Sequence, residues 1–444
     1  MSKFDAAAAT AQYMATMSPE AHAKATAYTQ GGHWVMLWGA VISLVIAWIV
    51  LRSGALQRTR AGIRNAWLAV ISVAVVSSLI ETILGLPWAI YSQWWREKSY
   101  GLTSQALSGW FVDQGKGLVI GLIVSIILYS LLYWLMRRAP KTWWAWGGGV
   151  TAGFIILMLL ISPTVIEPLF NKYTPAPAGA VRDTVVAMAK QVGVPSDKIF
   201  IYDGSKQSNR YTANVSGLFG SGRVAMSDVM FKKDADIAEV RGVVGHEMGH
   251  YVHMHVLWST LIYSLLAVIA FFLVDRLFNP VLRLTGAKGI SGIADPAGLP
   301  VLGIILTVLG LLATPVFSTI TRTMESDADR FSVVNFNEPD GLSKALVKTI
   351  EYRASSPSDL EEFIFYDHPS VENRVRKAME WKAAHMPSEA AAAAPTGAPA
   401  TAPKPAPADD IGVVGVAAPK GSRMETVPSN VEVGDITVEQ PKKK

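Results

Sequence analysis

The chain has 444 residues, of which 50% are hydrophobic and only 17% are charged. Soluble domains carry about 25% charged residues, so this composition indicates a membrane protein. The net charge of +5 is small for this length and is spread along the chain, which gives no case for nucleic-acid binding. With 0 cysteines, disulfides, thiolate metal ligands and lipid-modified cysteines within the chain are excluded.

The first segment is Ala-rich and polar, with no short apolar stretch ahead of a cleavage site, so we expect no cleavable signal peptide. Six apolar runs follow that are long enough to cross about 30 Å of hydrocarbon. They lie at about 34–52, 66–91, 118–136, 143–162, 256–278 and 299–319. Many of the 14 tryptophans flank these runs, as interfacial residues do.

These runs divide the chain into predicted parts. The parts are an N-terminal polar segment (1–33), a region of four spans (34–162), a soluble stretch (163–255), two further spans (256–319), a helical part (320–386) and a tail (387–444). Within the soluble stretch, periodicity predicts an amphipathic helix at 180–192 and short strands at 198–202 and 223–226. The tail is rich in Ala and Pro without apolar periodicity, so we expect it to be disordered.

A His-Glu-x-x-His motif lies at residues 246–250. Residues four apart on a helix share one face, so His246 and His250 can bind the same ion. Neutral imidazoles are good zinc ligands, and a catalytic zinc takes three protein ligands and a water. Glu247 is offset by about 100° and can act as a base on that water without binding the metal.

The residues around the motif support a packed helix rather than a chance match. Asp236, followed three residues later by Glu239, predicts the helix start. Gly242, Gly245 and Gly249 each cost the helix about 1 kcal/mol relative to alanine. Three such glycines at helical spacing indicate that another backbone passes close to this helix.

The third metal ligand has two candidates. His253 lies near the face of His246 and His250 but about 10 Å along the axis from His246, so we expect it to flank the site or contact substrate. Glu325 is the better candidate, because Asp329 lies one turn away and can hold a ligand histidine by its free ring N–H. An ordinary solvated charged helix would show the same pattern.

Val256 and His255, which follow the motif, bear on the class of zinc protease and on the number of ligands from this helix. A metzincin would need histidine where this chain has Val256, so that class is excluded. On a straight helix His255 lies roughly opposite His246, and we expect a structural role for it.

Further along, His368 precedes Pro369 in a mostly helical region. His368 could donate to the oxyanion of a tetrahedral intermediate, and Arg374 could bind a carboxylate or position His368. A surface histidine before a helix-starting proline would look the same.

Together these residues resemble the integral-membrane zinc endopeptidases of the CAAX prenyl protease type 1 family. The likeness runs from about residue 84 to 381. Besides the His-Glu-x-x-His motif and Glu325-x-x-x-Asp329, it is carried by residues 85–91, 97–102, 166–175, Ser205-Lys206, Gly217, 223–228, and Asp367-His368-Pro369 with Arg374.

The resemblance implies a mainly α fold: a multi-pass transmembrane helical bundle of about six spans, with a zincin-like α+β catalytic domain inserted at 163–255. It implies one zinc per chain on His246, His250 and Glu325, with Glu247 as general base and then acid. Asp329 would support the site, and the catalytic residues His368 and Arg374 would stabilise or orient substrate.

The resemblance also implies substrates and a location. Substrates would be peptides or unfolded proteins, lipid-modified ones included, met in contact with membrane lipid. The protein would be a multi-pass membrane protein, in the inner membrane of a bacterium or the endoplasmic reticulum of a eukaryote. The alternative class is a transporter or chaperone-like scaffold with a structural metal, although such a site needs a fourth protein ligand and no cysteine can supply it.

The chain departs from the family pattern in two places. The eukaryotic members have seven spans, whereas six are predicted here. The first span of those members has no counterpart in this chain. Where the family shows Asn-Ala-Tyr before the glycine matching Gly217, this chain has Thr212-Ala213-Asn214. The asparagine that grips substrate backbone is therefore replaced by Thr212 or displaced to Asn214, which makes the substrate preference uncertain.

The orientation in the membrane has two conflicting indications. Basic residues gather in the loops after the first, third and fifth spans: Arg52, Arg58, Arg60, Arg64, Arg137, Arg138, Lys141, Arg276, Arg283 and Lys288. The positive-inside rule makes these loops cytoplasmic and the metal site extracytoplasmic. The resemblance implies the opposite side, so both orientations stay open.

Overall fold

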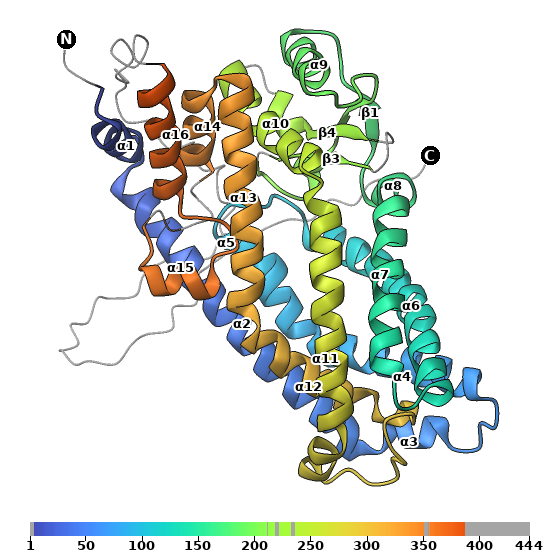
Figure 1. The fold of residues 1–444 in the computed structure, drawn as a ribbon. Helices are drawn as coiled ribbons and strands as arrows, with labels where there is room; N and C mark the ends of the chain where they lie inside the picture. Colours follow the sequence, from blue (N-terminus) through green and yellow to red (C-terminus); the bar gives the residue numbers. More distant parts are fainter. Residues whose placement is uncertain are drawn as a thin grey trace, which may run out of the picture. The chain divides into compact units, whose positions relative to one another are not determined.

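The computed structural model describes residues 4–210, 212–217, 222–231, 236–349, 354 and 356–386. The predicted tail at 387–444 lies outside these residues. Long helices dominate the described part (Figure 1). Five of them are apolar and long enough to cross a membrane: Pro19–Ser53, Ala66–Ser99, Leu107–Arg138, Trp143–Phe170 and His255–Thr285. Pro296–Leu312 and Thr314–Phe336 form a sixth span if the pair, bent by 55°, is counted as one.

Five of the six predicted apolar runs lie in these helices, and the sixth run lies in the bent pair. The helices of the spans are α2 (Pro19–Ser53), α4 (Ala66–Ala89) with α5 (Arg96–Ser99), α6 (Leu107–Arg138), α7 (Trp143–Ile161) with α8 (Glu167–Phe170), α11 (His255–Thr285), α12 (Leu299–Leu312) and α13 (Thr314–Phe336). Two π-helical turns, Ile90–Trp95 and Ser162–Ile166, make the second and fourth spans continuous. A short helix, α3 (Ala55–Arg60), joins α2 to α4.

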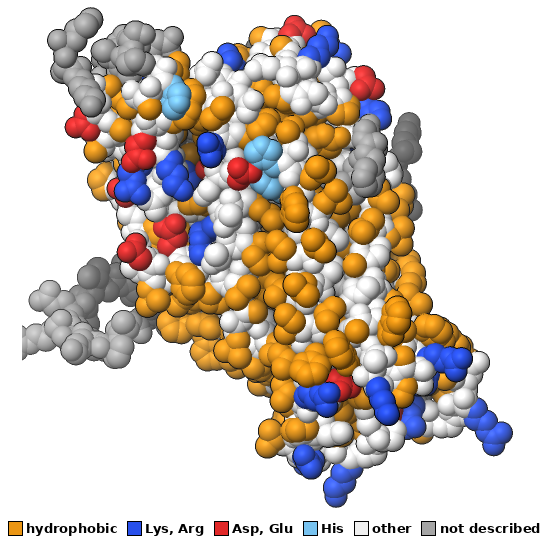
Figure 2. Space-filling view, viewed as in Figure 1, with side chains coloured by type: hydrophobic (Ala, Val, Ile, Leu, Met, Phe, Trp, Pro, Cys, Tyr) orange, Lys and Arg blue, Asp and Glu red, His pale blue; other side chains and the backbone are white. Residues whose placement is uncertain are grey.

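The spans expose large apolar side chains over most of their length. Trp38, Ile83, Val119, Leu261 and Leu265 are each more than half exposed. Figure 2 shows this as a broad hydrophobic surface, with Lys and Arg side chains gathered below it. Soluble monomers rarely expose so large an apolar surface, so the natural surroundings of these helices are lipid.

The first segment, 1–33, is helical over much of its described length. Asp5 accepts hydrogen bonds from the backbone N–H groups of Ala7 and Ala8 and so caps α1 (Ala6–Ala15). Apolar residues of α1 pack against α14 (Pro339–Lys348) and α16 (Val371–His385), and the Tyr13 hydroxyl donates to Asp340 at 2.7 Å. This segment therefore belongs to the packed structure around the C-terminal helices.

A four-stranded sheet lies between the fourth span and the motif helix in the chain. Its strands β1 (Tyr173–Pro175), β2 (Ile199–Tyr202), β3 (Ala213–Ser216) and β4 (Arg223–Ser227) lie in the order β1-β2-β4-β3. The β2 and β4 strands pair in parallel, and the two outer strands pair antiparallel. The predicted helix at 180–192 is α9 (Ala180–Val192), and the two predicted strands are β2 and β4. The sequence analysis did not predict β1 and β3, neither of which has the continuous apolar run seen in β2.

The motif helix is α10 (Ile237–Val252), with the predicted Asp236 cap in place. It packs between the sheet and the helices α13 and α14. A Cβ on Gly242 would lie 2.5 Å from the backbone nitrogen of Leu342, and one on Gly249 would lie 3.1 Å from the Cα of Ala328. The expected close approach of another backbone is thus confirmed, and it fixes α10 against α13.

The last described elements complete the C-terminal side. After α14 the chain forms α15 (Asp359–Phe365), which packs beside α13, and then α16. Arg322 of α13 ties α15 in place by donating hydrogen bonds to the carbonyl groups of Glu362 and Tyr366. These contacts bring the loop before α16 to the middle of α13.

Candidate metal centre

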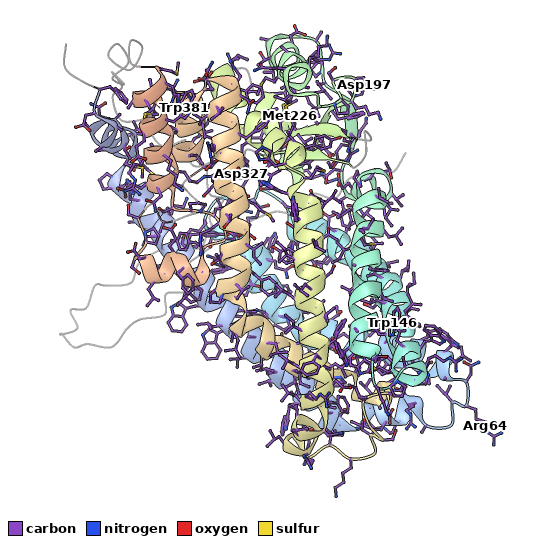
Figure 3. All side chains as sticks on the ribbon, viewed as in Figure 1. Arg64, Trp146, Asp197, Met226, Asp327 and Trp381 are labelled. Carbon is purple, nitrogen blue, oxygen red and sulfur yellow. The ribbon has the colours of Figure 1, made fainter. Side chains whose placement is uncertain are left out.

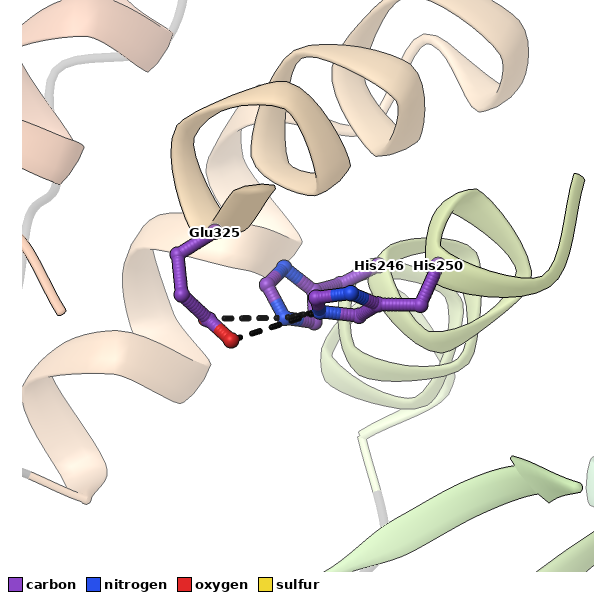
Figure 4. A group of neighbouring side chains, drawn as sticks. All are labelled: His246, His250 and Glu325. Atoms are coloured by element: carbon purple, nitrogen blue, oxygen red, sulfur yellow. Dashed lines mark hydrogen bonds and ion pairs between the residues drawn. The ribbon is translucent and has the colours of Figure 1, made fainter. Parts of the chain in front are cut away.

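Three side chains converge where α10 meets α13 (Figure 4). The Nε2 atoms of His246 and His250 are 3.1 Å apart. The Glu325 carboxylate lies 3.2 Å from Nε2 of His246 and 3.3 Å from Nε2 of His250. His246 and Glu325 are buried, so these donor atoms face one another out of bulk water.

This donor set fits a zinc ion. A tetrahedral zinc with bonds of about 2.0 Å places neighbouring ligand atoms about 3.3 Å apart, close to the separations of these three atoms. The Oε2 atom of Glu325 is buried and accepts no well-formed hydrogen bond, although imidazole nitrogens stand close to it. Two histidine nitrogens and one glutamate oxygen are also a known ligand set for catalytic zinc.

A buried ion pair stands behind His246. Asp329, one turn after Glu325 on α13, accepts a hydrogen bond from Nδ1 of His246 at 2.9 Å. Both Asp329 oxygens also accept from Arg374 of α16, from Nε and from Nη2, each at 2.7 Å. The arrangement fixes the His246 ring so that its Nε2 atom faces Glu325.

A cavity of about 470 Å³ opens in front of these residues. Its lining includes Thr212 and Ala213 of the sheet region, Glu247 of α10, and His368. Burial raises the pKa of Glu247 above its ordinary value, against the lowering effect of the neighbouring histidines. A carboxylate with a raised pKa is the more effective proton acceptor near neutral pH.

His368 lies beside the three converging side chains. Its Nε2 atom is 3.1 Å from Oε2 of Glu325, and its Nδ1 atom is 2.8 Å from Oδ1 of Asp367. The ring is partly exposed and lines the cavity. The structure thus brings together the seven residues to which the resemblance assigns a role at the site: His246, Glu247, His250, Glu325, Asp329, His368 and Arg374.

The sequence placed His255 wrongly. It was expected opposite His246 on one straight helix, but its Nδ1 atom lies 2.9 Å from Nδ1 of His250. The helix breaks at Met254, which has a φ of +52°, so the rotation assumed for a continuous helix does not apply. His255 and His253 both contact Asp327 of α13, a residue given no role in the sequence analysis.

The segment that departs from the family pattern lies beside the cavity. The Thr212 hydroxyl shares a 2.8 Å hydrogen bond with the Tyr202 hydroxyl. Asn214 lies within β3, opposite Ala225 of β4, and its Oδ1 atom is buried without a hydrogen-bond partner.

Comparison with known proteins places the chain in a family. Residues 5–172 match the family described as "CAAX prenyl protease N-terminal, five membrane helices", and residues 175–382 match "Peptidase family M48". Among relatives, the chain is 27% identical to an uncharacterized metalloprotease of Bacillus subtilis, over 82% of this chain and 86% of that one. It is 27% identical to CAAX prenyl protease 1 of Saccharomyces cerevisiae, over 67% and 69% of the two chains.

A solved structure shows the same fold. The chain superimposes on the crystal structure of S. mikatae Ste24p with a TM-score of 0.70, at 22% identity, over 82% of this chain and 90% of that one. The predicted class, a mainly α multi-pass membrane bundle with an inserted α+β domain, is thereby confirmed, and the structure adds that the sheet of this domain is small and mixed. These matches favour an enzyme over the alternative of a transporter or scaffold, and the chain belongs to the M48 family of CAAX-protease-type membrane metalloendopeptidases.

Proposed function

We propose that the protein hydrolyses peptide bonds with one zinc ion held by His246, His250 and Glu325. The observation that carries this proposal is the separation of 3.1 to 3.3 Å between the three ligand atoms. When bound, zinc supplies a Lewis acid for the scissile carbonyl and lowers the pKa of water to about 7.

Glu247 moves the proton in this proposal. Its carboxylate lines the cavity beside both histidines, so it can take a proton from the attacking water as general base. The same carboxyl group then returns the proton to the leaving amine as general acid.

Two further residues, His368 and Arg374, act at the site in different ways. His368 lies at the cavity wall. A His368 ring protonated at both nitrogens donates to Asp367 from Nδ1 and can donate from Nε2 to the carbonyl oxygen as negative charge develops. Arg374 is buried, and both of its strong hydrogen bonds go to Asp329. We therefore assign Arg374 an indirect role: it holds Asp329, which orients His246.

The sheet supplies a place for an extended substrate. In the described part of the sheet β3 is an end strand, and Ala213 at its start lines the cavity. An extended peptide can pair its backbone with such an edge without demanding a particular sequence. Because the site stands on membrane-spanning helices and the relatives include CAAX prenyl proteases, we propose membrane-associated peptides as substrates, lipid-modified ones among them.

The test is zinc analysis together with cleavage of a fluorogenic peptide. Glu247→Gln should keep one zinc per chain and lower the turnover rate at least about 100-fold, because the proton acceptor is lost. His246→Ala, His250→Ala and Glu325→Ala should each lose zinc and activity together. Full zinc occupancy in Glu325→Ala would remove Glu325 from the ligand set and return His253 as a candidate.

Substrates can be found with the same variant. Membranes that contain either the intact protein or Glu247→Gln are compared by quantitative proteomics of peptide termini. Substrates should accumulate uncut only with the variant. A lipid-modified peptide cut no faster than its unmodified form would show that the lipid is not recognised.

A further inference from the structure

A second group of side chains adjoins the proposed zinc site and has no part in the proposed mechanism. His255 and His253, on either side of the break between α10 and α11, both contact Oδ2 of Asp327. Figure 3 shows Asp327 on α13, in the upper half of the view. The His255 ring is also in edge contact with His250, with 5.0 Å between ring centroids.

The backbone brings His255 to this place at a cost. Met254 adopts the left-handed conformation, with a φ of +52°, and ends α10 before α11 begins. For a residue other than glycine this conformation costs about 1 to 2 kcal/mol. The turn carries the His255 ring back against α10, where it is only 7% exposed.

Counting protons along these contacts gives one consistent arrangement. If His250 offers Nε2 to the metal, its Nδ1 atom carries the ring proton and is a donor. The only partner described for that donor is Nδ1 of His255, at 2.9 Å. A neutral His255 that accepts at Nδ1 carries its own proton at Nε2, and this donates to Asp327 at 3.0 Å.

We propose that His255 and Asp327 are positioning residues that hold His250 toward the metal. Each ligand histidine is then anchored by a carboxylate of α13. His246 is held directly by Asp329, whereas His250 is held by Asp327 through the imidazole of His255. This inference rests on the proposed zinc site. Hydrogen bonds of this kind fix the ring orientation and raise the basicity of the ligand nitrogen.

A second cation site is the competing explanation for the same residues. Ligand atoms of His253, His255 and Asp327 lie within 4.8 Å of one another. A cation on Nε2 of a neutral His255 would move the ring proton to Nδ1. Two N–H groups, of His255 and His250, would then face each other at 2.9 Å with no acceptor between them. A cation at that site would therefore break the hydrogen bond between His250 and His255. The arrangement in which His250 donates to His255 and His255 donates to Asp327 is favoured for this reason.

The test measures the zinc dissociation constant of the full-length protein in detergent, by competition with a chelator. His255→Leu removes the acceptor and should raise the dissociation constant about 10- to 100-fold. His255→Asn places an amide oxygen near the position of Nδ1 and should restore most of the affinity. His253→Leu is the matched control, since His253 contacts the same carboxylate without joining the chain to His250.

A double-variant comparison distinguishes loss of the hydrogen bonds from His250 through His255 to Asp327 from general damage to the fold. Asp327→Ala should weaken zinc binding in the natural background but add little in the His255→Leu background, because it acts through His255. An equal loss in His253→Leu, or a second zinc that disappears in this variant, would overturn the inference in favour of a second metal site. Unchanged affinity in His255→Leu would refute the inference alone, whereas a natural protein without zinc would refute the proposed function.

Discussion

At the scale of single residues, the site is built from buried charges that neutralise one another. Asp329 and Arg374 are both less than 10% exposed, and two parallel hydrogen bonds of 2.7 Å join them. A buried charge without a partner costs several kcal/mol, so each of these groups depends on the other. Because Asp329 also holds His246, the ion pair couples the stability of the fold to the geometry of the site.

This coupling predicts the effect of removing the arginine. Arg374→Ala leaves Asp329 buried and unpaired, and we expect it to lower the free energy of unfolding by about 3 to 5 kcal/mol. Peptide cleavage should fall with it, because His246 loses its anchor. The measurement is thermal unfolding in detergent, with Arg376→Ala as the control on an exposed position of the same helix. Equal unfolding temperatures for the two variants would contradict the prediction.

At the scale of elements, the motif helix is wedged between its neighbours. Gly242, Gly245 and Gly249 face α13 and α14 at distances that leave no room for a side chain. The glycines weaken α10 as an isolated helix, since glycine has a low helix propensity. The glycines let α10 and α13 approach closely enough for their metal-ligand side chains to meet. The free energy gained by this close packing outweighs the helix stability that the glycines cost.

A pair of glycine substitutions tests this balance. In Gly242→Ala the new Cβ would lie 2.5 Å from the backbone nitrogen of Leu342, which cannot move aside cheaply. We expect a loss of about 1 to 3 kcal/mol in stability, with lower activity because α10 shifts relative to Glu325. Gly153 of α7 is the control, because a Cβ there meets nothing within 4 Å and alanine should be neutral or mildly stabilising. Equal behaviour of the two variants would refute the packing argument.

At the scale of the whole described structure, the basic loops gather at the end remote from the site. Arg52 donates to the carbonyl oxygen of Gly286, and Gln57 donates to that of Lys288, so the loops after the first and fifth spans lie together. Trp143, which directly follows the loop after the third span, donates to Asp275 of α11. Figure 3 shows Arg64 at this end and Asp197 at the opposite end. The spans lie between them, so the two ends face different sides of the membrane.

The absence of cysteine makes this arrangement easy to test. Single variants Arg64→Cys and Asp197→Cys introduce the sole thiol into a chain with 0 cysteines. In intact cells or sealed vesicles a membrane-impermeant maleimide should label one of them and not the other. Labelling of both from one side would contradict the spanning arrangement. The side from which Arg64 is labelled decides between the charge rule and the family analogy.

The helices that carry the site are joined directly to membrane spans, and this predicts which substrates can enter. The α10 helix leads into α11 after two residues, and α13 follows α12 at a break of one residue, so both halves of the site stand on spans. Polar ligands at such a position must be enclosed around water rather than face lipid. Substrate should therefore enter as a flexible segment.

A matched pair of substrates checks this expectation. One cleavable sequence is offered as a free peptide and again within an exposed loop of a rigid folded protein. The free peptide should be cut and the folded carrier should not, because the carrier cannot thread its loop between the helices. Equal rates for both would favour an open groove on the surface.

The sequence by itself determined the spans, the motif helix and the residues of the candidate site. Apolar runs and helical periodicity are local properties, so the six spans, α9 and the Asp236 cap could be read without a structure. Spacing brought His246 and His250 to one face. The Glu325-x-x-x-Asp329 pattern, 75 residues after His250, supplied the third ligand candidate, and the family resemblance supported it.

Only the tertiary structure decided how these residues support one another. Several features depend on contacts between distant segments, which no local pattern records. They are the partner of Arg374, the strands β1 and β3, and the 55° bend between α12 and α13. The position of His255 depends on a single backbone angle at Met254. One residue in the left-handed conformation redirects the following helix. The sequence does not predict it there, because glycine, asparagine and aspartate adopt this conformation far more often than methionine.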